Sequence, residues 1–415
     1  VNTNFVKYSI LVSSPLQNIL RAFAHRNYRF YWTGHAISLI GTWMQTLAQG
    51  WLVWQMTESP FWLGIVSAMS QLPSLLFGSF GGVLVDRAGK RKLLLITQAG
   101  LAVSAAVMAF ITLAGFVQLW HIVLIATLSG LFAAVDAPAR LSFIQDLVGK
   151  EDLGNAVALN SSTFNGARLV GPAIAGLLVP IVGEGGCFLL NSLSYAALII
   201  ALLQMKELPH THKPTKSVFH EWHEAFNFIR HSPIHRTLIL NTLVFGAFGF
   251  AYTVLMPVFA DKILEIGVRG LGMLMGTIGV GALFGGLWQA SLPNGAKRGR
   301  LVIGGAVGLA IGALGFSFSR SLPLSLVLLA FVGFAGISML ASTNTLLQSL
   351  APDHLRGRVM GFYTTAFLGI SPIGNFLVGS IASKLGASYA MAVVSLFCLL
   401  YAVTTIIWNP KLKSV

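Results

Sequence analysis

Long runs of apolar residues separated by short polar loops cover almost the whole chain. Six runs precede residue 206 and six follow residue 236. Each is long enough for an α-helix to cross a hydrocarbon core about 30 Å thick. The pattern therefore predicts an all-α membrane protein of about twelve transmembrane helices, at residues 28–54, 62–85, 93–117, 120–139, 156–182, 187–205, 237–260, 270–292, 301–319, 322–347, 359–385 and 388–408.

One long polar segment, residues 206–236, interrupts this pattern and divides the chain into two nearly equal parts. Its apolar residues Phe219, Trp222, Phe226 and Ile229 recur at spacings of three and four, which is typical of an amphipathic helix at a membrane surface. We therefore expect an N-terminal cytoplasmic segment (1–27), a six-helix bundle (28–205), a cytoplasmic linker (206–236) and a second six-helix bundle (237–415).

The two parts are related in sequence. Shifting residues 145–183 by 203 positions, without a gap, lays them on residues 348–386, and eight positions then match. Both segments enter the membrane from the same side, which indicates a parallel repeat about an axis normal to the membrane. We therefore expect two bundles related by a pseudo-twofold axis, with a site between them. Five of the matches are glycine pairs: Gly154/Gly357, Gly166/Gly369, Gly171/Gly374, Gly176/Gly379 and Gly183/Gly386.

The charges fit a membrane protein and orient it. Only 10% of residues are charged and the mean hydropathy is +0.76, whereas a soluble domain carries roughly a quarter charged residues. The net charge of +14 reflects Lys and Arg in alternate loops, which the positive-inside rule assigns to the cytoplasm. We expect a multi-pass protein of the bacterial inner membrane with both termini cytoplasmic, and no nucleic-acid partner.

Motifs for enzymatic chemistry are lacking. The sequence has no Walker loop, no G-x-S-x-G and no H-E-x-x-H, so neither ATP-driven pumping nor hydrolysis is supported. Six of the ten histidines lie between residues 210 and 235. Without a cysteine or carboxylate pattern, we favour a solvated, pH-sensitive loop over a metal site. The sequence predicts no enzyme, no cofactor and no metal.

The loop after the second predicted helix reads Gly82-Val-Leu-Val-Asp86-Arg87-Ala-Gly89-Lys90-Arg91-Lys92. It resembles the G-x-x-x-D-R-x-G-R-R signature of the major facilitator superfamily. The resemblance implies a cytoplasmic gate in which Asp86 faces the start of helix eleven, near Val359, and Lys90 pairs with Asp136. The matching loop of the second half has Gln289 where the aspartate would lie, which argues against a symmetrical second gate.

Two further segments resemble a narrower branch of that superfamily. Asp136-Ala-Pro138-Ala-Arg140 and the stretch from Asn165 through Arg168 to Gly171-Pro172 are similar to the enterobactin-exporter-like, or transmembrane secretion effector, proteins. Gly171-Pro172 also resembles the helix-five motif of drug–proton antiporters. The resemblance implies export from the cytoplasm, often of siderophores or drugs. It adds Asp136 and Arg140 to the candidate gate residues Gly82, Asp86, Arg87, Gly89, Lys90 and Arg91.

Polar residues within predicted helices indicate a cavity. Helix one carries a stripe on one face at helical spacing, and a polar stripe faces protein or water rather than lipid. Helix seven carries a similar but more aromatic row, which suggests an amphiphilic or aromatic cargo, although core packing explains it equally well. The stripe consists of His35, Ser38, Thr42, Gln45 and Gln49, and the second row of Asn241, Phe245, Phe248 and Tyr252.

On helix five, Ser161, Asn165, Arg168 and Pro172 share a face. Arg168 lies about 18 Å into its helix, where a charge is costly unless it is paired or hydrated. A structural ion pair is the alternative, but no acidic residue is evident at that depth. We therefore expect Arg168 to attract negative charge on a cargo.

Together these features predict a secondary active exporter of a small amphiphilic or anionic organic compound, of the siderophore or drug class, working by alternating access. Protons are a candidate coupling ion through His35 or Asp136, although helices one, seven and ten carry no mid-helix carboxylate. A lipid or lysolipid translocator and a membrane sensor that does not transport remain the alternatives. The expected partners are a small-molecule substrate and membrane lipid, and the expected state is a monomer.

Overall fold

The computed structural model describes residues 20–87, 89–205, 218–293 and 296–415. For residues 79–87 and 218–222 it describes the backbone alone. The described part is helical throughout its regular structure, without a strand. The side chains of Asp86 and Arg87, and the surroundings of Gly82, therefore lie outside the described residues, so the expected contact of Asp86 with helix eleven stays a prediction.

Among the described residues, ten helices are long and apolar enough to cross a membrane. One of them, α6, has 52 residues and contains a break at Gly183, so it crosses twice. Helix α2 is not among these ten helices, because its polar stripe lowers its hydropathy. With α2 added and α6 counted twice, the described chain has the twelve crossings that the sequence predicts. The first six are formed by α2 (Arg26–Thr57), α3 (Pro60–Arg87), α4 (Lys90–Leu113), α5 (Leu119–Val148) and α6 (Leu153–Gln204).

The last six crossings follow a short helix, α7 (Val218–His231), in the linker. Helices seven and eleven are interrupted by π-helical turns, in which hydrogen bonds run from i to i+5. Helix seven consists of α8 (Pro233–Val244), η2 (Phe245–Gly249), α9 (Tyr252–Val258) and η3 (Phe259–Ile263). The others are α10 (Gly267–Ala290), α11 (Arg298–Phe318), α12 (Leu322–Leu350), then α13 (Arg356–Thr364) with η4 (Thr365–Gly369) and α14 (Ser371–Leu385), and α15 (Ala387–Trp408).

Two helix ends differ from the sequence-based prediction. The fourth crossing was expected to end at residue 139, but α5 continues to Val148, and α6 begins as early as Leu153. Hydrophobicity marks where the chain leaves the lipid, whereas the hydrogen-bonded helix continues into water. Asp136 consequently lies twelve residues, or about 18 Å, before the end of α5 rather than near it.

The repeated glycines occupy equivalent places in the two halves. Gly183 and Gly386 both have positive φ angles, 69° and 84°, at the turns after helices five and eleven. A Cβ at Gly171 would press on the backbone of α2, and one at Gly374 on the carbonyl of Ala247 in helix seven. Helix five thus packs on helix one as helix eleven packs on helix seven. This equivalence supports the parallel repeat that the sequence alignment indicated.

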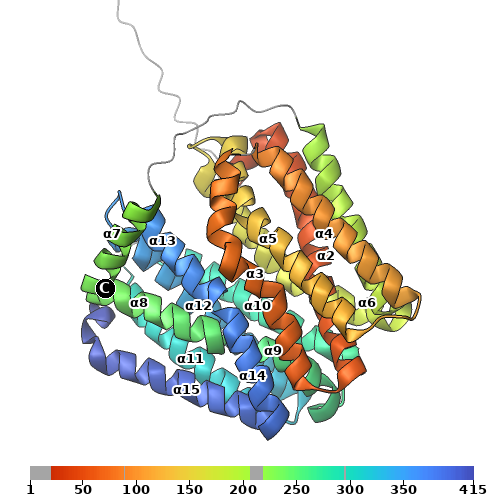
Figure 1. The fold of residues 1–415 in the computed structure, drawn as a ribbon. Coiled ribbons are helices and arrows are strands. Elements are labelled where there is room, and N and C mark those ends of the chain that lie inside the picture. Colours follow the sequence, from red (N-terminus) through yellow and green to blue (C-terminus); the bar gives the residue numbers. More distant parts are fainter. Residues whose placement is uncertain (1–19, 88, 206–217, 294–295) are drawn as a thin grey trace, which may run out of the picture.

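The two halves form separate bundles that meet at one end and diverge toward the other (Figure 1). The diverging end, at which α6 ends and α7 begins, is here called the linker end (Figure 1). There α7 packs on α8 and α13 of the second half, with Ala225 and Ile229 buried. The linker helix is therefore attached to the second bundle.

Candidate functional site

At the end opposite the linker, the halves are joined by polar contacts between helices one and seven. The Trp54 indole N–H donates to a carboxylate oxygen of Asp261 at 3.0 Å. Beside it, the ammonium of Lys262 lies 2.9 Å from a carboxylate oxygen of Glu58, and both side chains are exposed. Exposed ion pairs contribute little stability, so we expect these contacts to align the helices rather than hold them.

The same end contains two close backbone crossings between the halves. A Cβ at Gly64 would lie 2.7 Å from the Asn375 carbonyl oxygen and 3.0 Å from the Gly379 Cα, which joins α3 to α14. A Cβ at Gly272 would lie 2.9 Å from the Gly176 Cα, which joins α10 to α6. The two crossings are related by the pseudo-twofold axis. We call them the glycine crossings, and they close the molecule at this end.

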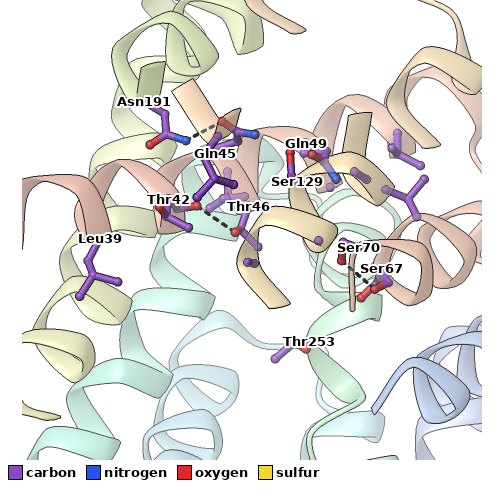
Figure 2. A pocket seen from close by; sticks show the side chains of 18 of the residues that line it. Leu39, Thr42, Gln45, Thr46, Gln49, Ser67, Ser70, Ser129, Asn191 and Thr253 are labelled. Atoms are coloured by element: carbon purple, nitrogen blue, oxygen red, sulfur yellow. Dashed lines mark hydrogen bonds between the residues drawn. The ribbon is translucent and has the colours of Figure 1, made fainter. Parts of the chain in front are cut away.

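A cavity of about 320 Å³ lies between the halves, within the usual range for sites that hold drug-sized molecules. The two halves contribute differently to its lining. The first half supplies hydroxyl and amide side chains from helices α2 to α6, as Figure 2 shows for those labelled, together with apolar side chains such as Leu39, Leu63 and Leu101. The second half supplies the mainly apolar set Thr253, Val254, Pro257, Leu271 and Met275. The site therefore suits a molecule with both polar and apolar parts.

One charged pair reaches the cavity. Asp136 and Arg140 stand one turn apart on α5, and a guanidinium nitrogen lies 2.6 Å from a carboxylate oxygen. Asp136 is 1% exposed, whereas Arg140 is 24% exposed. The other carboxylate oxygen accepts from the Thr97 hydroxyl and the Gln98 amide of α4, each at 2.8 Å. The carboxylate is thus fully engaged, and the pair adds no net charge to the site.

Aromatic and imidazole groups surround this pair. A nitrogen of Arg140 lies 3.3 Å from the His35 ring of α2, and His35 stacks on Tyr31 with ring centroids 5.3 Å apart. Tyr195 of α6 also lines the cavity, and its hydroxyl bonds the Thr42 hydroxyl at 3.1 Å. His35 is 3% exposed and lies behind Arg140, outside the cavity lining.

The expected pair between Lys90 and Asp136 is wrong for this structure. Lys90, at the start of α4, lies 2.7 Å from a carboxylate oxygen of Asp146 instead, and Arg91 donates to the carbonyl of Leu202 at 2.8 Å. Asp146 is ten residues, or about 15 Å, further along α5 than Asp136. The extension of α5 beyond residue 139 thus brings a nearer acid to Lys90. Gly89 precedes α4 at φ −56°, a conformation open to any residue.

The other candidate site residues fall into two groups. Thr42, Gln45 and Gln49 line the cavity, and so do Asp136 and Arg140, which the sequence had assigned to a gate. Asn165, Arg168, Asn241 and Tyr252 do not line it. Asn241 and Tyr252 are buried, and Asn165 bonds its own helix at the Ser161 carbonyl.

Arg168 lies where the two halves meet. Its guanidinium stands 5.8 Å from the centre of the Trp43 ring. Among the described residues no carboxylate pairs with it. A half-buried arginine that lies over a ring face instead of an acid keeps its charge available to a ligand.

Sequence reasoning missed several residues of the site, among them Thr97, Gln98, Asn191 and Tyr195. Each is a polar residue inside a strongly apolar run, which is the available signal, but none forms a stripe of its own. Of the clustered histidines, His210 and His212 lie outside the described residues, and His220 is described by its backbone alone. The described residues contain no group of three His, Cys, Asp or Glu side chains that could hold a metal ion.

Two six-helix bundles around a central cavity define a membrane transporter of the major facilitator fold. Solved structures agree: the chain has a TM-score of 0.73 to a bacterial homologue of the lysosomal transporter Spinster, at 13% identity over 97% of this chain and 99% of that one. It has the same score to a D-xylose–proton symporter, at 16% identity over 92% of this chain and 97% of that one. At such identities the likeness shows the fold alone.

Sequence comparison identifies the family within this class of transporters. Residues 18–415 match the transmembrane secretion effector family, and the chain belongs to it. The multidrug efflux pump Tap of Mycolicibacterium fortuitum is 27% identical over 90% of this chain and 93% of its own length. The staphyloferrin A transporter of Staphylococcus aureus is 23% identical over 93% of this chain and 97% of its own length. The enterobactin exporter EntS of Shigella flexneri is 25% identical over 94% of this chain and 95% of its own length. The chain is a multi-pass inner-membrane transporter, not an enzyme.

Proposed function

We propose that this protein exports a small amphiphilic organic compound, of the siderophore or drug class, from the cytoplasm by alternating access. The observation that carries this proposal is the cavity between the halves, in which the first half supplies the hydrogen-bonding groups and both halves supply apolar surface. The named activities of the relatives, drug efflux and siderophore transport, support the same class. We propose that it works as a monomer within the membrane lipid.

The arrangement of contacts supports an inward-facing state. The glycine crossings and the Trp54–Asp261 bond close one end, and the bundles diverge at the linker end (Figure 1). The excess of Lys and Arg in the loops at that end supports a cytoplasmic location for it. We therefore propose that both termini are cytoplasmic. Cargo enters from that side, and the crossings open when the halves rock.

We further propose that export is coupled to proton entry at Asp136. When Asp136 is ionised, its charge and that of Arg140 cancel. When it is protonated, Arg140 keeps a positive charge that cavity water must hydrate. A neutral cargo displaces that water and so favours the ionised pair, because a charge in a dehydrated site is costly. Binding of cargo therefore releases the proton, and by reciprocity a bound proton expels the cargo.

Everted membrane vesicles test this function. Respiration acidifies their interior, and a pH-sensitive dye reports the gradient while candidate siderophores, drugs and lysolipids are added. We expect at least one siderophore or drug to dissipate the gradient only in vesicles that contain the protein, and to accumulate inside. A sensor would bind ligand without flux, and a lipid translocator would move labelled lysolipid alone. Either result would reject the proposal.

Arg168 supports an anionic cargo as the alternative. It carries a charge without an acidic partner at the meeting of the halves. An anion would favour protonated Asp136, so that cargo and proton would move in the same direction. On this alternative, Arg168→Gln should weaken binding of a carboxylate-bearing compound about tenfold, the loss of one charge-assisted hydrogen bond, and spare its neutral amide. Equal effects on both compounds, in folded protein, would remove Arg168 from the site.

A further inference from the structure

The two glutamines of the cavity wall differ in how their amides are held. Gln45 and Gln49 stand one turn apart on α2 and both line the cavity. The Asn191 side chain of α6 donates to the Gln45 carbonyl oxygen at 2.6 Å (Figure 2). Gln49 makes no hydrogen bond within the described residues. The Gln45 amide therefore has one orientation, whereas that of Gln49 can turn.

Asn191 is itself fixed. It is completely buried, and the single proton of the Ser194 hydroxyl is shared between the Asn191 main-chain carbonyl oxygen at 2.7 Å and its side-chain carbonyl oxygen at 2.9 Å. With the side-chain oxygen turned toward Ser194, the Asn191 amino group faces α2 as a donor. Gly41 makes room for this pair, since a Cβ there would overlap both the Ser194 hydroxyl and the Asn191 carbonyl. In this arrangement the donation runs from Asn191 to Gln45.

The direction of this hydrogen bond determines which group of the Gln45 amide is free to bind a ligand in the cavity. Its carbonyl oxygen is engaged by Asn191, so the group left for a ligand is its amino group, a hydrogen-bond donor. A donor held in place by two further residues is pre-organised, and it binds an acceptor without losing side-chain freedom. The complementary ligand group is an oxygen with lone pairs, such as a carbonyl.

The charge of that ligand group follows from the surroundings. Asp136 and Arg140 cancel each other, and the other lining residues are uncharged. A carboxylate at Gln45 would therefore lack a counter-charge, which makes its dehydration costly. Opposite Gln45's helix, Val254, Pro257, Leu271 and Met275 form an apolar wall.

We propose that the cavity selects a neutral, carbonyl-bearing amphiphile, whose oxygen accepts from the Gln45 amino group and whose apolar body packs against the second half. Asn191 is a positioning residue that sets the donor without touching the cargo. The proposal rests on the proposed export function, since it names the cargo of the same cavity.

Binding of three probes with one dimethylamino-naphthalene body tests the proposal: a propionyl ketone, the propyl analogue without oxygen, and a carboxylate. Affinities are measured by fluorescence titration of the protein in nanodiscs, against empty nanodiscs. We expect the ketone to bind the wild type about fivefold more tightly than the propyl analogue, as one neutral hydrogen bond allows, and more tightly than the carboxylate.

Gln45→Leu and Asn191→Leu should each abolish the ketone preference. Their double variant should lose no more, because the two residues act as a unit. Gln145→Leu, the same substitution at an exposed position outside the cavity, should keep the preference. A merely structural role would weaken both neutral probes alike and leave their ratio unchanged, and that result would overturn the proposal.

Three other outcomes would also overturn it. These are wild-type binding of none of the probes, an Asn191→Leu variant that keeps the preference, and tightest binding of the carboxylate. Failure of export is separable from failure of this inference. A ketone preference without flux in vesicles would reject export and keep the site, whereas flux without the preference would reject the site and keep export.

Discussion

Replacing Asp136 with asparagine is expected to abolish proton-coupled transport and to destabilise the protein. The substitution leaves Arg140 without its counter-charge at a largely buried position, and breaking a buried ion pair costs about 3–5 kcal/mol. Thermal unfolding in detergent measures the loss of stability. Transport against a gradient, measured in everted vesicles, should fall to background while downhill movement of cargo persists.

The double variant Asp136→Asn with Arg140→Gln separates the two effects. Removing both charges is often neutral for stability, so the double variant should recover most of the lost stability. Its transport should stay uncoupled, because no ionisable carboxyl remains in the cavity lining. His35→Gln serves as the comparison on the neighbouring helix. Uphill transport with normal proton counterflow in the double variant would exclude Asp136 as the coupling group.

Adding a side chain at a glycine crossing should also abolish transport, by opening the closed end. A Cβ at Gly379 would lie 2.7 Å from the Pro60 carbonyl oxygen and 2.8 Å from the Gly64 Cα. Both are backbone atoms, so the helices must separate. Overpacking of this kind costs about 1–3 kcal/mol, enough to shift a two-state equilibrium about 5- to 150-fold. Gly379→Val and Gly272→Val should therefore each favour the outward-open state.

Electron–electron distances between spin labels at Gln118 and Ser321 measure that shift, since both residues are exposed in loops at the closed end. We expect the distances to lengthen in both variants. Gly286→Val is the matched control, because a Cβ at Gly286 meets no atom within 4 Å. Unchanged distances in correctly inserted Gly379→Val and Gly272→Val would show that the crossings do not hold the closed state.

The fold was largely predictable from the sequence, because lipid leaves few alternatives to a helix for each apolar run. The C-terminal end of α5 and the start of α6 were not predictable, because hydropathy does not show where a helix begins or ends in water. The glycine repeat identified equivalent positions, but only the structure shows that Gly176 and Gly379 face Gly272 and Gly64 across the halves.

The site was predictable in part. A stripe at helical spacing is a property of one helix, so the polar face of α2 could be read directly. Partners on other helices have no fixed spacing in sequence. The sequence therefore gave no means to pair Lys90 with Asp146 or to place Asn191 beside Gln45. Arg168 shows the same limit, because its depth was evident and its contact with the Trp43 ring was not.

The π-helical turns η2, η3 and η4 have a mechanical consequence. In the described chain they occur in the second half alone, although both halves descend from one repeat. A π-turn contains one residue more than a regular helical turn, and the position of this extra residue can move along the helix. Each move by one residue rotates the helical segment on one side of the π-turn relative to the segment on the other side by about 100°. We therefore expect the first half to move as a rigid body when the halves rock. The second half should accommodate the movement by twisting within helices seven and eleven.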